Sequence, residues 1–259
     1  METNTEKLIE FDAAKLQTPA ARRGFLAELA IAAGAVALAP MITQGRRLNG
    51  MLLANHSTLS ITDILNYALT LEYLEATFYL RAEGRGRLPQ GASVASIDPD
   101  GNGEPGRVPG LASVRPPLPA TFNVMQFVRT VRDHEITHVL FLQNALGNVA
   151  LDREDFAFDF GNAFDSAENF LAVSQVLEDT GVTAYTGQVR RLVELGNDPV
   201  LSAAGSIAGV EAEHAAAFRY INDVFITPNN ASFDDPATVA EVLAAAGGFI
   251  TEAPDLPFD

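Results

Sequence analysis

Cysteine is missing from all 259 residues of the chain. This excludes disulfides, thiolate zinc sites, iron–sulfur clusters and cysteine nucleophiles, so any metal has to be held by Asp, Glu or His. Basic residues are scarce: 17 Lys and Arg stand against 33 Asp and Glu, giving a formal net charge of −16. Because such a charge repels nucleic-acid backbones and anionic membrane surfaces, neither is expected as the main partner.

Long apolar runs are also missing. The most apolar stretch, within residues 18–40, is shorter than the about 20 residues of a spanning helix, so no integral membrane span is expected. The stretch begins with a paired arginine and continues through Phe25 into an Ala-rich segment, which is typical of a twin-arginine export signal. We therefore expect export to the periplasm or cell envelope, with an amphipathic surface helix as the alternative.

The remaining sequence predicts an all-α protein. It shows no βαβ alternation, no Gly-rich phosphate loop and no nucleophile elbow, and its 47% hydrophobic content is ample for a core. Helical periodicity between start and stop signals predicts four long helices, a shorter one and an irregular Pro-rich tail. The helices are expected at about 60–83, 119–146, 165–196, 198–225 and 236–246.

One connection between these helices is unusually long. Residues 84–118 form a Gly/Pro-rich insertion between the first and second helices, and an insertion of this length usually carries function or covers something. Four long helices with one long connection favour a four-helix bundle of ferritin type over an up-down bundle with uniform tight loops. The expected domains are an export signal and linker at 1–45, the bundle at 58–226, and a short helix with tail at 227–259.

Two glutamates are each followed by histidine at the third position, as Glu135-Ile-Thr-His138 and Glu211-Ala-Glu-His214. This spacing puts both side chains on one helix face, within reach of the same metal. The faces are otherwise apolar, so these polar groups are expected to point inward. A buried carboxylate needs a partner, and a metal ion is one.

The first and third helices each offer a matching carboxylate. Glu72 is followed seven residues later by Tyr79, and Glu178 is followed seven residues later by Tyr185. Glu72 lies on the same helix face as Leu65, Leu69, Ala76 and Tyr79, which favours Glu72 over Glu75 as the inward carboxylate. The tyrosines are interpreted mainly as core packing, with a radical or proton-relay role near the metals as the alternative.

Together the helices supply four carboxylates and two imidazoles. Four carboxylates balance the charge of two divalent ions, and hard oxygen with imidazole ligation suits iron or manganese. The sequence therefore predicts a two-metal carboxylate site like those of other bundle proteins.

Four segments resemble, in order, the helices of a known family: LNYALTLEYLEATFYLRA, HEITHVLFLQNALG, FLAVSQVLEDTGVTAYTG and IAGVEAEHAAAFRYI. The family is the bacterial ferritin-like domain family that includes the desiccation-related proteins, whose members often begin with a twin-arginine signal. The resemblance covers residues 20–225. It implies a ferritin-like bundle with the metal ligands Glu72, Glu135, His138, Glu178, Glu211 and His214. One departure is His134, which stands where relatives commonly have an acidic residue.

The insertion also contains Asp98, Asp100 and Asn102 in the alternation of the first half of a calcium loop. The twelfth position is Pro109, which cannot supply the usual bidentate acid. A plain Gly/Asp-rich turn is therefore favoured over a calcium site.

The leading functional hypothesis is a metal-dependent oxidoreductase of the cell envelope, acting on peroxide or dioxygen in stress protection. Peroxide splitting is slightly favoured over oxygenation, because no cysteine or haem-type ligand offers an electron route. A non-enzymatic desiccation-stress scaffold and an iron-binding or storage protein are the alternatives. Alanine-rich helix surfaces allow a homo-oligomer.

Overall fold

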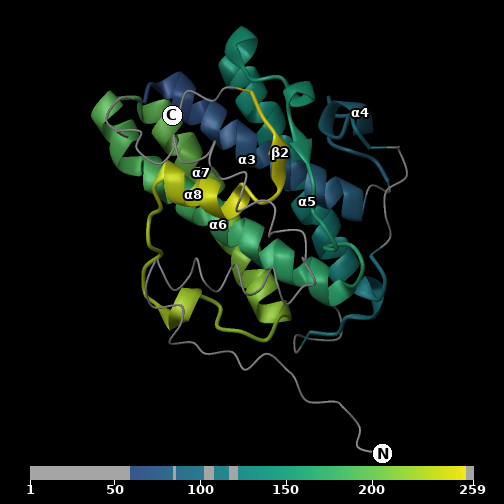
Figure 1. Cartoon of the computed structure of the whole chain (residues 1–259). Helices are drawn as coiled ribbons and strands as arrows, with labels where there is room; N and C mark the ends of the chain where they lie inside the picture. Colours follow the sequence, from purple (N-terminus) through teal and green to yellow (C-terminus); the bar gives the residue numbers. More distant parts are fainter. Residues whose placement is uncertain (1–58, 84–85, 102–107, 117–121, 255–259) are drawn as a thin grey trace, which may run out of the picture.

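The computed structural model describes residues 59–83, 86–101, 108–116 and 122–254. The predicted export signal at 1–45 lies outside these residues. Within them, the chain is predominantly helical, and four long helices form a bundle (Figure 1). These helices are α3 (Ile61–Ala82), α5 (Val124–Leu146), α6 (Ala167–Leu195) and α7 (Asp198–Ile221).

Helix α3 begins at a reciprocal cap. Ser60 Oγ accepts from the backbone N–H of Asp63 at 3.2 Å, and Asp63 Oδ2 accepts from the backbone N–H of Ser60 at 2.8 Å. Most of the helix is buried, because α3 packs against α5 and also contacts α6. It is therefore an interior helix with hardly any solvent-facing side.

Two predicted helix ends differ from the structure. Helix α5 begins at Val124, because the Asn123 side chain accepts from the backbone N–H of Gln126 and caps the helix there. Helix α7 ends at Ile221 rather than near residue 225, and Asp223 already has a positive φ of 56°. A residue at positive φ cannot continue a right-handed helix.

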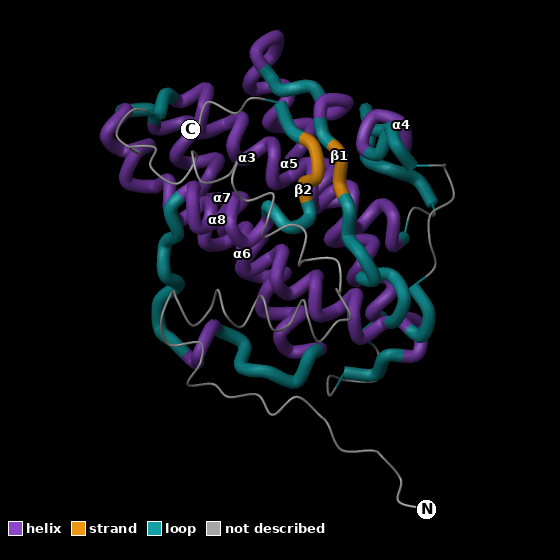
Figure 2. Tube along the Cα trace, viewed as in Figure 1, coloured by secondary structure: helices purple, strands orange, loops and turns teal. Residues whose placement is uncertain are grey.

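Shorter elements surround the bundle (Figure 2). The segment between α3 and α5, expected to lack regular structure, contains α4 and η4. The expected irregular tail contributes β2, which pairs antiparallel with β1. The elements are α4 (Val94–Ile97), η4 (Leu111–Ser113), η5 (Gly147–Val149), η6 (Arg153–Asp155), β1 (Ala157–Phe158), η7 (Pro228–Asn230), α8 (Val239–Ala246) and β2 (Ile250–Glu252).

The C-terminal segment is docked onto α6. The backbone N–H of Ala237 donates to the Thr183 carbonyl at 3.1 Å, and a Cβ at Gly187 would lie only 1.9 Å from the Ala237 carbonyl oxygen. A larger residue at position 187 would push this segment away. Helix α8, predicted from the sequence, thus packs closely against α6.

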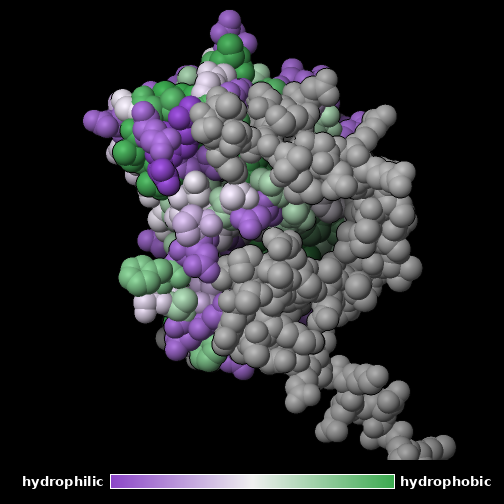
Figure 3. Space-filling model, turned by 60° about the vertical axis from the view of Figure 1, so that its left-hand side comes forward, coloured by the Kyte–Doolittle hydropathy of each residue, from purple (hydrophilic) through white to green (hydrophobic). Residues whose placement is uncertain are grey.

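Among the described residues, no helix is long and apolar enough to cross a membrane. On the face drawn in Figure 3, hydrophobic patches of described residues alternate with hydrophilic side chains.

Candidate metal centre

Six side chains from the four bundle helices meet inside the bundle in two overlapping groups. In each group, one potential ligand atom per residue lies within 4.8 Å of all the others. The groups are Glu72, Glu135, His138 and Glu211, and Glu135, Glu178, Glu211 and His214. Glu135 and Glu211 belong to both groups. They are therefore the central carboxylates, and each group has one further glutamate and one histidine.

The first group is built around the ring of His138. Its Nδ1 lies 3.0 Å from Glu135 Oε2, 3.2 Å from Glu72 Oε2 and 3.4 Å from Glu211 Oε1. The three carboxylates come from three different helices. The Glu-x-x-His spacing on α5 thus places its two members together, as predicted.

The second group surrounds His214, which contacts two carboxylates instead of three. Its Nδ1 lies 3.0 Å from Glu178 Oε2 and 3.0 Å from Glu135 Oε1. The two hairpins, α3 with α5 and α6 with α7, therefore contribute equivalent residues. The internal repeat seen in the sequence becomes a spatial repeat about the cluster.

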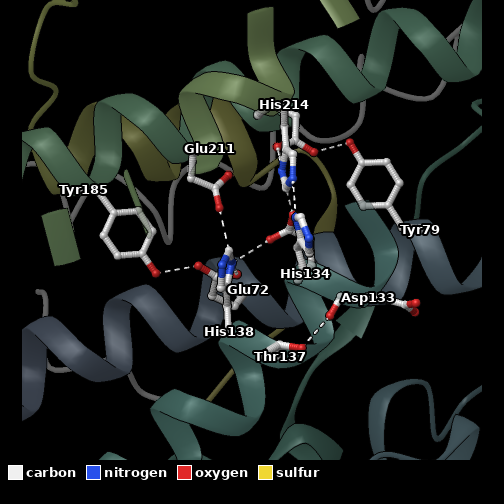
Figure 4. Close-up of polar contacts among 11 residues, drawn as sticks. Glu72, Tyr79, Asp133, His134, Thr137, His138, Tyr185, Glu211 and His214 are labelled. Carbon is white, nitrogen blue, oxygen red and sulfur yellow. Dashed lines mark hydrogen bonds and ion pairs between the residues drawn. The ribbon is translucent and has the colours of Figure 1, made fainter. Parts of the chain in front are cut away.

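The two predicted tyrosines lie on opposite sides of the cluster (Figure 4). The Tyr79 hydroxyl on α3 donates to Glu178 on α6, and the Tyr185 hydroxyl on α6 donates to Glu72 on α3. Each tyrosine thus orients a carboxylate of the opposite hairpin. The interpretation of both residues mainly as core packing is incomplete, since both are buried and also bonded to the cluster.

The charges in the cluster shift one another's pKa. Burial raises the pKa of Glu72 to about 7 against the opposing effect of the His138 charge. Burial alone would raise the pKa of Glu135, but hydrogen bonds from both histidines outweigh it and lower that pKa. Burial would lower the pKa of His214, but the Glu178 and Glu135 carboxylates raise it to about 11. Protons on the imidazoles therefore balance part of the carboxylate charge.

The Glu211 carboxylate is the least satisfied group of the cluster. It is fully buried, and its Oε1 lies 3.4 Å from His138 Nδ1, whereas its Oε2 has no hydrogen-bond partner among the described residues. Burial and repulsion from Glu135 raise its pKa well above the ordinary value. A buried carboxylate in this position needs a cation, and oxygen ligands with imidazoles suit iron or manganese. The residues present thus fit a metal site.

Glu75 is a fifth buried carboxylate near the cluster: the preference for Glu72 agrees with the ligand groups, which include Glu72 and not Glu75, but the implied solvent exposure of Glu75 is wrong. Glu75 is 3% exposed, and its pKa is raised by burial and then by repulsion from Glu211, Glu178 and Glu135. The face argument failed because it assumed that α3 has a solvent-facing side. A count of acidic residues on an otherwise apolar helix would have flagged Glu75.

His134 links the cluster to the protein surface. The residue is exposed, and its Nδ1 lies 2.9 Å from Nε2 of His214 with the two rings stacked. Burial and the His214 charge lower the pKa of His134. The imidazole of His134 therefore supports the ring of His214 from its outer side, on α7 rather than on its own helix.

Gly181 makes room for Glu211. A Cβ built on Gly181 would lie 2.6 Å from Glu211 Oε2, closer than real Cβ contacts allow. The glycine stands on α6, three residues after Glu178, so it faces the cluster. Any side chain at this position would displace the central carboxylate.

The calcium loop, which the sequence ranks below a plain Gly/Asp-rich turn, finds no support in the described residues. The Asp98 carboxylate accepts from Arg81 Nε at 2.9 Å and Arg81 Nη2 at 2.7 Å, with Arg153 Nη2 at 3.9 Å. Guanidinium groups already neutralise this carboxylate, and Asp100 is exposed. The third predicted ligand, Asn102, lies outside the described residues. The turn thus fastens α4 to α3.

Comparison with known proteins agrees with this geometry. Residues 60–223 match the ferritin-like domain family. The chain belongs to the ferritin-like domain family. A search of curated proteins finds no match.

Proposed function

We propose that the protein binds two iron or manganese ions in this cluster and reacts with peroxide or dioxygen. The carrying observation is that Glu135 and Glu211 belong to both ligand groups, while Glu211 Oε2 has no hydrogen-bond partner among the described residues. Two neighbouring metal ions are held together by carboxylates that belong to the ligand sets of both ions, and Glu135 and Glu211 could serve in this way. Glu72 and His138 would complete one ion's ligands, and Glu178 and His214 the other's.

When bound, such a metal pair supplies the two-electron chemistry that peroxide or dioxygen requires. The chain's own residues supply position and protons. Tyr79 and Tyr185 hold the outer carboxylates in place, and the raised pKa of Glu75 favours a protonated carboxyl beside the cluster. Peroxide splitting is the favoured reaction because it needs no external electron source.

We also propose that the protein is exported by the twin-arginine route and acts in stress protection. The support is the paired arginine followed by a short apolar stretch within residues 18–40. Folding before export would let the cluster load metal inside the cell. Fractionation of the producing cells tests this: the full-length protein should reach the envelope fraction, and a Lys-Lys replacement of the paired arginine should retain it inside.

The function is tested by elemental analysis of the purified protein, with a Glu135→Ala, Glu211→Ala double variant beside it. We expect close to two iron or manganese ions per chain and release of oxygen from added peroxide, both lost in the double variant. The exposed Glu213 offers the control, because Glu213→Gln on the same helix should keep both. Less than half an ion per chain, unchanged in the double variant, would refute the metal centre and leave a structural stress protein. Many irons per chain would indicate storage.

A further inference from the structure

An apolar cavity of about 200 Å³ lies inside the bundle next to the candidate metal centre. Its wall includes residues of α3, α5, α6 and α7, so it belongs to the core of the bundle. An apolar cavity of about 150 Å³ stays dry in water and binds benzene. This cavity is thus large enough for a molecule of one substituted ring.

The cavity occupies the layer directly beside the cluster. On three helices, a wall residue stands four positions from a candidate ligand: Ala68 on α3, Leu142 on α5 and Ile207 on α7. Four residues are about one helical turn, or roughly 6 Å along the axis. The fourth helix contributes Tyr185, whose hydroxyl donates to Glu72. A molecule in the cavity would therefore lie beside a residue that orients a ligand.

The wall contains a buried amide N–H donor for which no partner is found among the described residues. Gln188 is 3% exposed, and among the described residues nothing accepts a hydrogen bond from its Nε2. Apart from two tyrosines, the other wall residues are apolar, and the Tyr185 hydroxyl already donates to Glu72. A buried N–H without an acceptor is unfavourable, so a molecule that brings an acceptor gains from meeting it.

The lining of the cavity reaches the protein surface. Phe141 on α5 is 44% exposed and Pro199 on α7 is also exposed, although both line the cavity. A ligand would enter from the side where these two residues lie.

We infer that this cavity is a binding site for a small apolar molecule that carries one hydrogen-bond acceptor, such as an aryl ketone. Its ring fills the apolar wall, and its carbonyl oxygen accepts from Gln188 Nε2. The inference goes beyond the proposed function and does not require the metals. Binding to metal-free protein would stand even if the metal centre were refuted.

The test uses two probes of equal shape, acetophenone and α-methylstyrene, which differ only in C=O against C=CH₂. Full-length protein labelled at its methyl carbons is titrated with each probe, with and without chelator, and followed by NMR. We expect saturable shifts of the Leu71 and Ile207 methyl groups and an affinity about five- to tenfold higher for the ketone, from one added hydrogen bond. Equal affinities, or shifts confined to methyl groups outside the cavity, would overturn the inference.

Two variants separate the parts of the inference. Gln188→Leu should remove the preference for the ketone while keeping the hydrocarbon bound. Ala204→Leu, which fills the cavity from α7, should weaken both probes at least tenfold. The control is Ser202→Leu, because Ser202 is exposed on the same helix and does not line the cavity. Unchanged binding in a folded Ala204→Leu variant would place the probes elsewhere, and an unchanged ketone preference in Gln188→Leu would exclude the proposed hydrogen bond.

Discussion

Replacing Glu211 by glutamine should stabilise the metal-free protein and destabilise the metal-loaded one. Glutamine has nearly the same shape as a protonated glutamate but cannot ionise. In the metal-free protein, the Glu211 carboxylate is fully buried; its Oε1 lies 3.4 Å from His138 Nδ1, and its Oε2 has no hydrogen-bond partner among the described residues. In the loaded protein, the same carboxylate would hold both ions. The substitution therefore removes an unfavourable charge in one state and a shared ligand in the other.

The magnitude follows from the pKa shift of Glu211. Burial raises its pKa well above the ordinary 4.5, so folding favours its protonated form. Above that ordinary value, the unfolded chain releases the proton while the folded protein keeps it, which costs about 1.4 kcal/mol per pH unit. This destabilisation is absent below the ordinary pKa, where both states are protonated, and it grows as the pH rises above that value. Because neighbouring histidines offset part of the cost, we expect Glu211→Gln to gain about 1–3 kcal/mol at pH 7.

Differential scanning calorimetry with chelator measures this gain. For a domain of this size, about 1–3 kcal/mol corresponds to a rise of the melting temperature of roughly 3–10 °C, smaller at pH 5 than at pH 7. Added Mn²⁺ should raise the melting temperature of the natural protein but hardly that of the variant. The exposed Glu213→Gln should change neither value. A Glu211→Gln variant that melts lower without metal, or that keeps the full metal effect, would refute the reasoning.

Three further predictions concern the surroundings of the cluster. Gly181→Ala should fold but lose at least tenfold in Mn²⁺ affinity by calorimetric titration, because the new Cβ displaces a central carboxylate. Gly205→Ala, which has nothing within 4 Å of the new Cβ, should bind Mn²⁺ normally. Equal Mn²⁺ affinities of the two variants would contradict this prediction. Tyr79→Phe and Tyr185→Phe should each weaken metal binding about tenfold, because each removes a hydrogen bond to a candidate ligand. Tyr73→Phe is the control and should not weaken binding, because the Tyr73 hydroxyl donates to a loop carbonyl. A similar loss in all three variants would mean a general packing effect. Metal loading at pH 6 should release at least two protons per chain, because carboxylates raise the pKa of both site histidines and a histidine ligand must be neutral. Metal affinity should therefore rise with pH. Calorimetry in buffers of different ionisation enthalpy measures the protons released, and finding none would exclude the histidines as ligands.

Much of the fold was predictable because it depends on local patterns. Helical periodicity, the Ser60 cap and the stop near Gly196 define segments without reference to the rest of the chain. The three-residue spacing likewise fixes Glu135 beside His138 before any packing is known. The strand pair formed by β1 and β2 was not predictable, because its few residues pair across a long stretch of chain.

The sequence by itself predicted the four long helices and the six residues that could hold a metal, since helical periodicity and residue spacing are properties of a single helix. Only the tertiary structure decided how these residues are shared between two groups, because that depends on distances between helices. The same holds for the crossed bond from Tyr79 to Glu178, for the space that Gly181 leaves, and for the burial of Glu75. A helix pattern shows which side chains share a face, but only packing shows what each face meets.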